Sequence, residues 1–583
     1  MSARIVVGQG SCGLAAGAGA VYTAISEKLT GKATLSITGC IGICYLEPIV
    51  DVYAEDGTVY RCVQVRAEDA ETIAKAAEEQ NYDLLKDLVI KDEDAQFLTK
   101  QTRIALRHCG IINPEDIGAY IADDGYQALE KVLKTMTPEQ VIEEIKISGL
   151  GGRGGAGFPT WFKWNAARQS KGEEKYLICN ADEGDPGAFM DRAVIESDPH
   201  NLIEGMLIGA YAIGAKEAIV YVRAEYPLAI IRLQDAIRQA EEKGYLGENI
   251  LGTGFSCKMR IKAGAGAFVC GEETALIESL EGSRGMPRLK PPFPAQAGYW
   301  LKPSNINNVE TFANVAWIIN NGGAAFAAMG TENSKGTKVF AVTGKVCRSG
   351  LVEIPMGKTL RDVIFDIAGG IRDGHEFKAV QLGGPSGGCI PAHLLDTVID
   401  YRALGATGAI MGSGGMVVMD ETTCMVGIAK FFLEFTTRES CGKCVHCRIG
   451  TKRLSETLER IVKGNGKEGD IELLEELCNT IKDGALCGLG QTAPNPVLTT
   501  IRYFRNEYEA HIVDKKCPAK ECPALLTYSI DTEKCIGCGL CAKKCPVKAI
   551  SGELKKPYTI DPNVCIRCGQ CIHSCRKGAV TVE

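Results

Sequence analysis

The sequence feature that constrains this chain most is a cysteine spacing that occurs twice near its carboxy-terminal end. Residues 535–545 read CIGCGLCAKKC, and residues 565–575 read CIRCGQCIHSC. A zinc ribbon needs only four cysteines in two pairs, whereas duplicated C-x2-C-x2-C-x3-C runs are typical of two [4Fe–4S] clusters, the last cysteine of each run binding the other cluster. The spacing predicts two ligand sets, namely Cys535, Cys538, Cys541 and Cys575 for one cluster and Cys565, Cys568, Cys571 and Cys545 for the other.

Cysteine usage along the whole chain indicates metal or redox chemistry inside a cell. Fifteen of the 26 cysteines lie between Cys441 and the end, and close spacing in a large chain indicates metal binding rather than disulfides. The opening, MSARIVVGQGSCG, lacks the parts of a signal peptide, and no apolar run reaches about 18 residues. We therefore expect a cytoplasmic protein that does not span a membrane.

Length and charge set the number of modules and exclude one class of partner. A chain of 583 residues is expected to form roughly four to six modules. The net charge of −7, without a basic block, argues against nucleic acid as a partner. Residues 527–583 resemble a two-cluster ferredoxin and form the last module.

A third cluster is predicted upstream from the segment ESCGKCVHCRIG. It contains Cys441, Cys444 and Cys447, again in C-x2-C-x2-C spacing, and needs a fourth ligand. Residues 471–483 have apolar side chains at helical spacing, so Cys478 would lie in mid-helix, whereas Cys487 lies in the glycine-flanked segment LCGLG. We prefer Cys487 as the fourth ligand of this [4Fe–4S] cluster.

The linker at 507–526 contains a possible zinc site. The segment HIVDKKCPAKEC contributes one imidazole and two thiols, and three cysteines with one histidine are a common structural zinc set. The predicted ligands are Cys478, His511, Cys517 and Cys522, with Cys478 the least secure. Unused thiols in a linker are the alternative.

The middle of the chain is rich in glycine. Residues 148–164 read SGLGGRGGAGFPTWFKW, which lacks the G-x-x-x-x-G-K-[ST] pattern of a Walker loop. Such a backbone can approach a phosphate or a flat ring closely, with free N–H groups and one cation, Arg153. A flexible linker is the alternative, but linkers seldom end in the apolar run FPTWFKW.

Four further segments follow in the same region. They are NADEGDPGAFMDR (180–192), AGAGAFVCGEETALIESLEG (263–282), RGMPRLKPPFPAQAG (284–298) and NINNVETFANV (305–315). The second of these leads from a glycine loop into a predicted helix with Glu272 and Glu273 at its start, where acids are also favoured by the helix dipole alone.

These five segments, in this order, resemble the NADH-binding flavoprotein subunit of respiratory complex I and its soluble relatives. The resemblance runs from about residue 140 to 500 and implies a Rossmann-like core over 148–334. It implies FMN contacts from Gly149, Gly151, Arg153, Gly154, Lys163, Asn180, Asp182, Gly271, Glu272, Asn307, Asn308 and Thr311. It implies NAD contacts from Phe158, Asp185, Glu273, Lys290 and Phe293. Some complex I members have Glu at the position of Asp185, so the choice between NAD and NADP stays open.

The chemistry agrees with this resemblance. Hydride transfer between a nicotinamide and a flavin needs stacked rings and a dry site rather than an acid–base residue, so no catalytic side chain is predicted. Phe158 would stack on a ring, and Lys163 with the loop N–H groups would stabilise the reduced flavin. The cluster of the 441–447 triplet must then lie within tunnelling distance.

Residues 335–420 alternate in strand fashion before a helical stretch and look like the ubiquitin-like β-grasp insert of the same family. We expect it to be structural or interface-forming, followed by a helical bundle over 421–506 that carries the third cluster. The isolated thiols Cys347, Cys389 and Cys424 are interpreted as buried apolar residues.

The amino-terminal segment 1–90 resembles a thioredoxin-like [2Fe–2S] ferredoxin domain. That fold uses two cysteines in each of two loops, and here the second loop has Cys40 and Cys44 while the first has only Cys12. A possible [2Fe–2S] site of these three thiols is one interpretation, and a docking domain without a cluster is the other; Cys62 lies in a predicted strand. Residues 91–147 read as a helical bridge, with His108 and Cys109 as packing residues.

We expect a multidomain α/β chain. Its combination of modules resembles the beta subunit of soluble electron-bifurcating [FeFe]-hydrogenases of anaerobes. This implies a hetero-oligomer with a catalytic hydrogenase or formate dehydrogenase subunit, a small thioredoxin-like [2Fe–2S] subunit and soluble ferredoxin. An NADH dehydrogenase (diaphorase) subunit of a formate dehydrogenase or non-bifurcating hydrogenase is the alternative. A third hypothesis is an electron-wiring scaffold with an inactive flavin site, against which the intact glycine loop argues.

Overall fold

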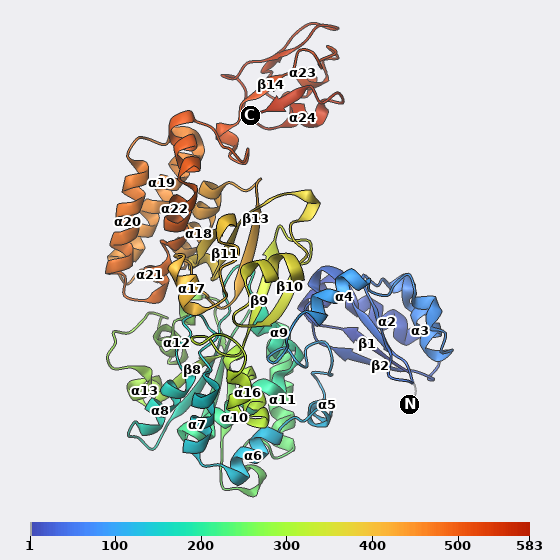
Figure 1. Ribbon diagram of the computed structural model, residues 1–583, viewed down its shortest axis with the longest axis vertical. Coiled ribbons are helices and arrows are strands. Elements are labelled where there is room, and N and C mark those ends of the chain that lie inside the picture. Colours follow the sequence, from blue (N-terminus) through green and yellow to red (C-terminus); the bar gives the residue numbers. More distant parts are fainter. Residues whose placement is uncertain (1–2) are drawn as a thin grey trace. The chain divides into compact units, whose positions relative to one another are not determined.

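The computed structural model describes residues 3–583 (Figure 1). Residue contacts divide the chain into two compact units, Met1–Val418 and Met419–Glu583. The first unit contains three sheets, and the second contains a helical bundle and a small module with two short sheets. Among residues 3–583, no helix combines the length and the apolar character that crossing a bilayer requires.

The amino-terminal sheet has the strand order β2-β1-β3-β4. β1 is parallel to β2 and antiparallel to β3, which pairs antiparallel with β4. The strands are β1 (Arg4–Gly8), β2 (Thr34–Thr38), β3 (Val50–Tyr53) and β4 (Val59–Cys62), with helices α1 (Ser11–Ala16), α2 (Ala18–Lys28) and α3 (Ala70–Glu78). The predicted strand at Cys62 is confirmed as β4, whereas Cys12 lies in the first turn of α1 rather than in a loop.

The next segment is helical, as predicted. Its helices are α4 (Asp92–Thr99), α5 (Ile117–Ala122), α6 (Gln127–Thr135) and α7 (Pro138–Ser148). α7 begins at a capping box in which Thr137 and Gln140 exchange hydrogen bonds, with Pro138 in the first turn. The buried His108 ring lies 2.7 Å from an Asp198 oxygen, so His108 is a packing residue with a charged partner.

The core sheet is entirely parallel, with the order β7-β6-β5-β8. Its strands are β5 (Tyr176–Ala181), β6 (Glu217–Arg223), β7 (Lys258–Gly264) and β8 (Ser304–Asn308). Helices that include α8 (Thr160–Gln169), α9 (Met190–Ser197), α10 (Pro199–Ile213), α11 (Pro227–Glu242), α12 (Glu273–Leu280), α13 (Pro294–Ala297), α14 (Val309–Ala313), α15 (Val315–Asn321) and α16 (Gly323–Ala327) accompany it. β5 and β6 are buried almost throughout, as expected for parallel strands covered on both faces.

A five-stranded mixed sheet follows, with the order β10-β9-β13-β11-β12. Its strands are β9 (Thr337–Gly344), β10 (Gly350–Pro355), β11 (Phe377–Leu382), β12 (Gly388–Pro391) and β13 (Gly415–Asp420), and α17 (Tyr401–Ala406) precedes β13. The predicted strands and the helical stretch after them are confirmed. Buried Glu353 on β10 accepts hydrogen bonds from the Ala105 and Leu106 amides and thereby joins this sheet to the helical bridge.

The second unit begins with a bundle, drawn in orange in Figure 1. Its helices are α18 (Met425–Glu439), α19 (Thr451–Arg460), α20 (Asp470–Gly484) and α22 (Asn495–Glu509), with the short α21 (Gly488–Thr492) between the last two. They share one apolar core.

The last module has two matching halves. β14 (Tyr528–Ile530) pairs antiparallel with β17 (Val580–Val582), and β15 (Ile550–Ser551) pairs antiparallel with β16 (Thr559–Ile560). Each half has one short helix, α23 (Leu540–Lys544) or α24 (Gln570–Ser574). The duplication seen in the cysteine spacing is therefore also a duplication of structure.

Candidate functional site

The predicted flavin-binding segments follow the carboxyl ends of the parallel core sheet. β5 ends at Ala181, β7 ends at Gly264 and β8 ends at Asn308. β6 and β7 extend the sheet on one side of β5, while β8 lies on its other side. Ligands of open α/β sheets bind beyond the carboxyl ends of the strands at such a reversal of strand order. The topology therefore brings three predicted segments, far apart in the sequence, to one edge.

The first glycine loop, residues 149–157, begins where α7 ends and lies against α17. Gly149 ends the helix in the left-handed conformation, with φ of 64°. A Cβ at Gly157, where φ is also 64°, would stand 2.8 Å from the Tyr401 ring. The Tyr401 hydroxyl donates to the Gly152 carbonyl over 3.0 Å. The loop is therefore a fixed backbone surface rather than a flexible linker.

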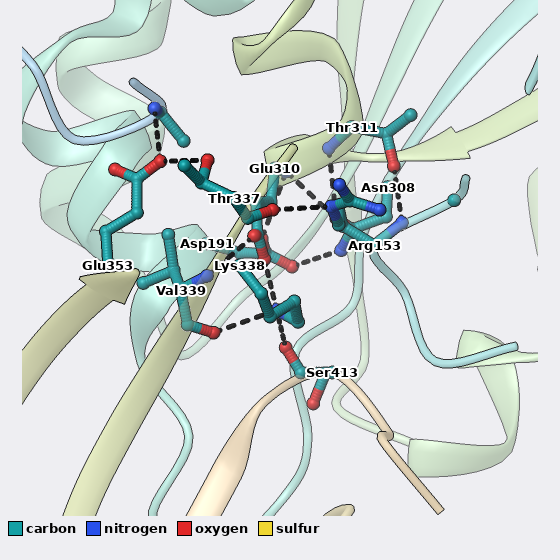
Figure 2. A network of polar contacts seen from close by, with 12 residues as sticks. Arg153, Asp191, Asn308, Glu310, Thr311, Thr337, Lys338, Val339, Glu353 and Ser413 are labelled. Atoms are coloured by element: carbon teal, nitrogen blue, oxygen red, sulfur yellow. Dashed lines mark hydrogen bonds and ion pairs between the residues drawn. The ribbon is translucent and has the colours of Figure 1, made fainter. Parts of the chain in front are cut away.

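Arg153 is buried and holds the glycine loop in place (Figure 2). Its guanidinium donates to the carbonyls of Thr337 (3.0 Å), Gly151 (2.9 Å) and Lys335 (2.6 Å). Its backbone N–H donates to the Thr311 hydroxyl over 2.9 Å. These bonds fix the loop relative to both α14 and β9. The predicted contact of Arg153 with a flavin stays a prediction.

Asn308 caps α14 and connects it to α9 (Figure 2). Its side-chain oxygen accepts from the amides of Glu310 (2.9 Å) and Thr311 (3.4 Å), and its amide donates to an Asp191 oxygen over 2.5 Å. A Cβ at Gly154 would stand 3.1 Å from the Asn308 Cβ. Loop, helix cap and strand end therefore pack together as one unit.

A buried ion pair lies beneath this arrangement. The Lys338 ammonium donates to Glu310, to the Val339 carbonyl (2.8 Å) and to the Ser413 carbonyl (2.5 Å) (Figure 2). Both charged side chains are at most 2% exposed. Burial raises the pKa of the Glu310 carboxyl, while the ammonium acts in the opposite direction. The pair joins the NNVET segment to the five-stranded sheet.

Four charged side chains alternate in sign beside α12. The Lys163 ammonium lies 3.2 Å from Glu273, and the Lys290 ammonium lies 2.7 Å from Glu273 and 3.0 Å from Glu272. Lys163 also donates to the Ile306 carbonyl on β8 over 2.7 Å. Burial favours the neutral carboxyl, but the two ammonium groups lower the pKa of Glu273. Residues predicted for FMN and for NAD are thus joined in one network.

Arg223, at the end of β6, was not predicted. Its Nη1 is buried, makes no hydrogen bond within residues 3–583 and lies 3.7 Å from an Asp182 oxygen. The nearby Asn180 amide donates to the Gly271 carbonyl over 2.8 Å. A buried guanidinium N–H without an acceptor fits a site that receives a polar ligand. The signal available in the sequence was a cation at the end of the largely apolar run EAIVYVR.

The predicted nicotinamide residues are more exposed than the flavin set. Phe158 is 49% exposed and Phe293 is 53% exposed, as suits side chains that cover a ligand arriving from solvent. The Asp185 carboxylate accepts from the Ser413 hydroxyl over 2.6 Å, and burial raises the pKa of Asp185 to about 6. Asn307, from the predicted flavin set, is buried instead. Its side-chain oxygen accepts a hydrogen bond from the Trp164 ring N–H over 2.9 Å.

The cysteine triplet lies between α18 and α19 of the helical bundle. Burial raises the pKa of the Cys447 thiol to about 11, and the thiols of Cys444, Cys487 and Cys441 act in the same direction. Cys487 immediately precedes α21. Cys478 lies in the middle of α20, as predicted, and is fully buried in the apolar core. The structure therefore brings Cys487, and not Cys478, to the triplet.

Each half of the last module has a cavity lined by one predicted ligand set. Apolar side chains and Cys535, Cys538, Cys541 and Cys575 line a cavity of about 240 Å³. A smaller cavity is lined by Cys545, Cys565, Cys568 and Cys571. Three cysteines from one run thus meet the last cysteine of the other run in both cavities, which is the arrangement that the duplicated spacing predicts.

A compact group of four buried ligand residues lies between α18 and the linker: Cys424, His511, Cys517 and Cys522. The His511 Nε2 lies 3.3 Å from the Cys424 sulfur and 3.4 Å from the Cys522 sulfur, and these two sulfurs are 3.6 Å apart. The His511 Nδ1 lies 2.7 Å from the Glu507 carbonyl, which leaves Nε2 for a metal. The donor set and its spacing fit tetrahedral zinc.

Three predictions about single thiols are wrong. Cys478 is not the fourth member of the His511 group, because its sulfur is not among those that meet there; Cys424, interpreted as an apolar residue, takes that place. Cys347 is exposed rather than buried. Cys389 is buried, as predicted. The sequence could not pair Cys424 with His511, since 87 residues separate them.

Three thiols meet in the amino-terminal module. The sulfurs of Cys12, Cys40 and Cys44 all lie within 4.8 Å of one another, and those of Cys40 and Cys44 are 3.7 Å apart. Cys62 is fully buried in the apolar core of this module. The structure thus brings the three predicted residues together and gives Cys62 a packing role.

Three regions of the chain match known protein families. Residues 145–317 match the Nuo51 FMN-binding domain, residues 427–511 match the NADH-ubiquinone oxidoreductase-F iron–sulfur binding region, and residues 528–551 and 558–581 each match the 4Fe–4S binding domain. The matched regions coincide with the core sheet and its glycine loop, the bundle with the cysteine triplet, and the two halves of the last module.

Whole proteins give the same result. The chain is 62% identical over 458 residues to the HndC subunit of the NADP-reducing hydrogenase of Solidesulfovibrio fructosivorans, covering 79% of this chain and 93% of that protein. It is 48% identical over 415 residues to a subunit of the NADH-quinone oxidoreductase of Rhizobium meliloti, covering 71% and 99%. A solved NAD⁺-reducing [NiFe]-hydrogenase chain aligns with a TM-score of 0.62 at 32% identity, covering 88% of this chain and 85% of that chain. The chain belongs to the family of NADH-binding FMN subunits that is shared by NADH-quinone oxidoreductase and NAD⁺-reducing hydrogenase, and it is an NADH dehydrogenase-type flavoprotein oxidoreductase subunit.

Proposed function

We propose that this chain is the FMN-bearing subunit of an electron-bifurcating complex. The complex exchanges electrons between NADH, ferredoxin and a catalytic partner subunit, and the partner that we propose is an [FeFe]-hydrogenase. The observation that carries the proposal is the convergence of the glycine loop, the NADE segment and the NNVET segment at one edge of the parallel sheet. A bound FMN supplies the conversion between two-electron nicotinamide chemistry and single electrons.

The residues of the chain would bind and orient the two nucleotides. The FMN set would be Gly149, Gly151, Arg153, Gly154, Lys163, Asn180, Asp182, Gly271, Glu272, Asn307, Asn308 and Thr311, to which the structure adds Arg223. The NAD set would be Phe158, Asp185, Glu273, Lys290 and Phe293. Lys163 would hold its positive charge beside the flavin, because its ammonium is already fixed between Glu273 and the Ile306 carbonyl. Phe158 and Phe293 would cover the nicotinamide and exclude water.

The cysteines would hold three [4Fe–4S] clusters. One would be bound by Cys441, Cys444, Cys447 and Cys487 and accept electrons from the flavin site. The two sets that line the cavities of the last module would hold the other two, and this module would serve the branch to external ferredoxin. Its duplicated form supports two cluster sites, since the four cysteines of each set line one cavity.

Zinc and a [2Fe–2S] cluster complete the proposed cofactors. Zinc at Cys424, His511, Cys517 and Cys522 would tie the linker to the bundle before the last module. A [2Fe–2S] cluster at Cys12, Cys40 and Cys44 would make the thioredoxin-like module electron-carrying rather than a docking domain. The proposed partners are a hydrogenase or formate dehydrogenase subunit, a small [2Fe–2S] subunit and soluble ferredoxin, in a cytoplasmic hetero-oligomer.

The alternative is a diaphorase subunit of a hydrogenase or formate dehydrogenase that does not bifurcate. The relative from Solidesulfovibrio fructosivorans favours it, because that protein is named as part of an NADP-reducing hydrogenase. This relative also leaves the choice between NAD and NADP to experiment.

The purified native complex separates the two functions. Bifurcation predicts that NADH alone does not drive the catalytic subunit and that NADH with reduced ferredoxin does. If NADH alone suffices and ferredoxin makes no difference, the diaphorase function is correct. NADH-dependent reduction of a viologen by the isolated chain tests the flavin site itself, which both functions require.

A further inference from the structure

The three thiols of the amino-terminal module do not complete a ligand set. A [2Fe–2S] cluster has two irons, each with two protein ligands, and only Cys12, Cys40 and Cys44 meet here. Four residues beyond Cys12 the chain continues with Ala16 and Gly17, which have no ligand atom in their side chains. The structure must therefore supply a fourth ligand from elsewhere or leave one iron incomplete.

Cys62, the one further thiol in this module, is not available as that ligand. It lies on β4 opposite Val50 and bridges to Val89. Its side chain is fully buried among the apolar residues of the module. Its sulfur is not among those that meet within 4.8 Å of one another.

Glu47 does lie at the thiols. Its Oε1 is 3.5 Å from the Cys12 sulfur. The same carboxylate accepts the Ile49 amide through Oε2 over 3.0 Å, so one oxygen is held by the backbone while the other points to the thiol. Glu47 lies only three residues after Cys44 in the chain. Its position is therefore tied closely to that of the second cysteine loop.

All three sulfurs lie within 4.8 Å of one another, and two contacts among the four groups have the length expected of ligands that share one metal. Two sulfurs on one tetrahedral metal stand about 3.8 Å apart, and a sulfur and a carboxylate oxygen stand about 3.6 Å apart, given metal–sulfur and metal–oxygen bonds of about 2.3 and 2.1 Å. Cys40 and Cys44 are 3.7 Å apart, and Cys12 and Glu47 are 3.5 Å apart. Each pair therefore has the spacing that one iron requires.

Glycines occupy the positions of the chain that face Glu47 and Cys40. A Cβ at Gly13 would stand 3.1 Å from the Glu47 Oε2 and 2.4 Å from the Gly8 carbonyl. A Cβ at Gly10 would stand 2.9 Å from the Cys40 Cβ. Glycines at these positions let the α1 turn that carries Cys12 approach both the carboxylate and the second loop.

We propose that Glu47 is the fourth protein ligand of a [2Fe–2S] cluster in the amino-terminal module. Cys40 and Cys44 bind one iron, and Cys12 and Glu47 bind the other. The proposal rests on the proposed function only in requiring that this module binds a cluster. A carboxylate has the same charge as a thiolate but is a harder, less electron-donating ligand, so the two irons become inequivalent and the iron bound by Glu47 acquires a distinct spectrum.

The test uses the full chain, purified without oxygen and labelled with ⁵⁷Fe, as the wild type and as Glu47→Ala and Glu47→Cys. EPR spectra of the reduced chain are recorded at a temperature at which [2Fe–2S] signals remain sharp and [4Fe–4S] signals broaden, and Mössbauer spectra are recorded on the same samples. We expect one ferric site with an oxygen ligand in the wild type. Glu47→Cys should convert it to a four-sulfur site with shifted g-values and a more negative reduction potential. Glu47→Ala should lose the signal or change its g-values.

Two control variants bracket these results. Glu68→Ala removes an exposed carboxylate of the same module, and Cys62→Ala removes the thiol in its core; both should leave the [2Fe–2S] spectrum unchanged. An unchanged spectrum in Glu47→Ala, or a lost spectrum in Cys62→Ala, overturns the proposal. A wild type with zinc or no metal at these thiols also overturns it. FMN content and [4Fe–4S] signals of the same samples report separately on the proposed function.

Discussion

The edge of the core sheet and the last module differ in how much of each site is held in place by protein contacts alone. At the sheet edge, the glycine loop is held by hydrogen bonds from Arg153, and the buried pair of Lys338 and Glu310 lies beneath it. In the last module the apolar core consists of five buried residues, Cys541, Ile550, Tyr558, Cys571 and Val580, two of which are predicted cluster ligands. The sheet edge is therefore preformed by the protein, whereas the small module is expected to depend on its metal for stability.

The largest expected effect comes from removing a ligand in the last module. Cys571→Ala should lose one cluster, about four irons per chain in a [4Fe–4S] set, and should open residues 527–583 to proteolysis, because the cysteine is a proposed ligand and also a core residue. Iron analysis and limited proteolysis measure the two effects. Cys389→Ala, which removes a buried thiol outside any predicted site, should change neither. If the module stayed resistant to protease without its iron, it would not depend on metal for stability and would not differ from the sheet edge in this respect.

The buried ion pair gives the largest effect expected at the sheet edge. Lys338→Met leaves Glu310 as an unpaired buried charge and should lower the free energy of unfolding by about 3–5 kcal/mol, with loss of bound FMN. The double variant with Glu310→Gln should recover much of the stability, since no charge is then left unpaired. Chemical denaturation and flavin content report both. Equal destabilisation in the single and double variants would show that the pair does not act as a unit.

The proposed zinc site provides a matched comparison of two buried cysteines in one bundle. Cys424→Ala should lose the bound zinc, because its sulfur lies 3.3 Å from the His511 Nε2. Cys478→Ala should keep the zinc and cost about 1 kcal/mol from the lost packing. Metal analysis of the two variants shows whether Cys424 or Cys478 binds the zinc. Zinc lost from Cys478→Ala and kept in Cys424→Ala would restore the ligand set that the sequence predicted.

The smallest expected effect is a pH dependence at Asp185. Burial raises the pKa of its carboxyl from 3.8 to about 6, against the Ser413 hydroxyl and the Arg223 guanidinium. A raised pKa means that the folded protein binds the proton more tightly than the unfolded chain does, so this contribution to stability is present below about pH 4 and is lost as the pH rises through about 6. Relative to Asp185→Asn, the wild type should be more stable at about pH 4 than at about pH 8 in thermal unfolding. A constant difference across this range would contradict the assignment.

The fold and the sites differ in how far the sequence could predict them. Periodic segments such as 471–483 and the alternating strands at 337–355 were predicted correctly, because helix and strand periods are local properties. The duplicated cysteine runs also predicted which thiols share a cavity, since the spacing itself encodes the exchange of the fourth ligand.

Residues that act across long separations could not be predicted in this way. Cys424 joins His511 only through the packing of α18 on α22, and Arg223 reaches the site only because β6 lies beside β5. Glu47 carries no motif and is identified by its distance from the Cys12 sulfur alone. In each case tertiary packing, rather than local spacing, decides the neighbour.

The most direct measurement of the central claim is an anaerobic NADH titration of the purified, flavin-replete chain. Binding at the preformed sheet edge predicts about one FMN per chain, whose visible absorbance is lost on addition of NADH while EPR signals of reduced [4Fe–4S] clusters appear. A chain that binds no FMN, or whose bound FMN and clusters stay oxidised in excess NADH, would contradict the account.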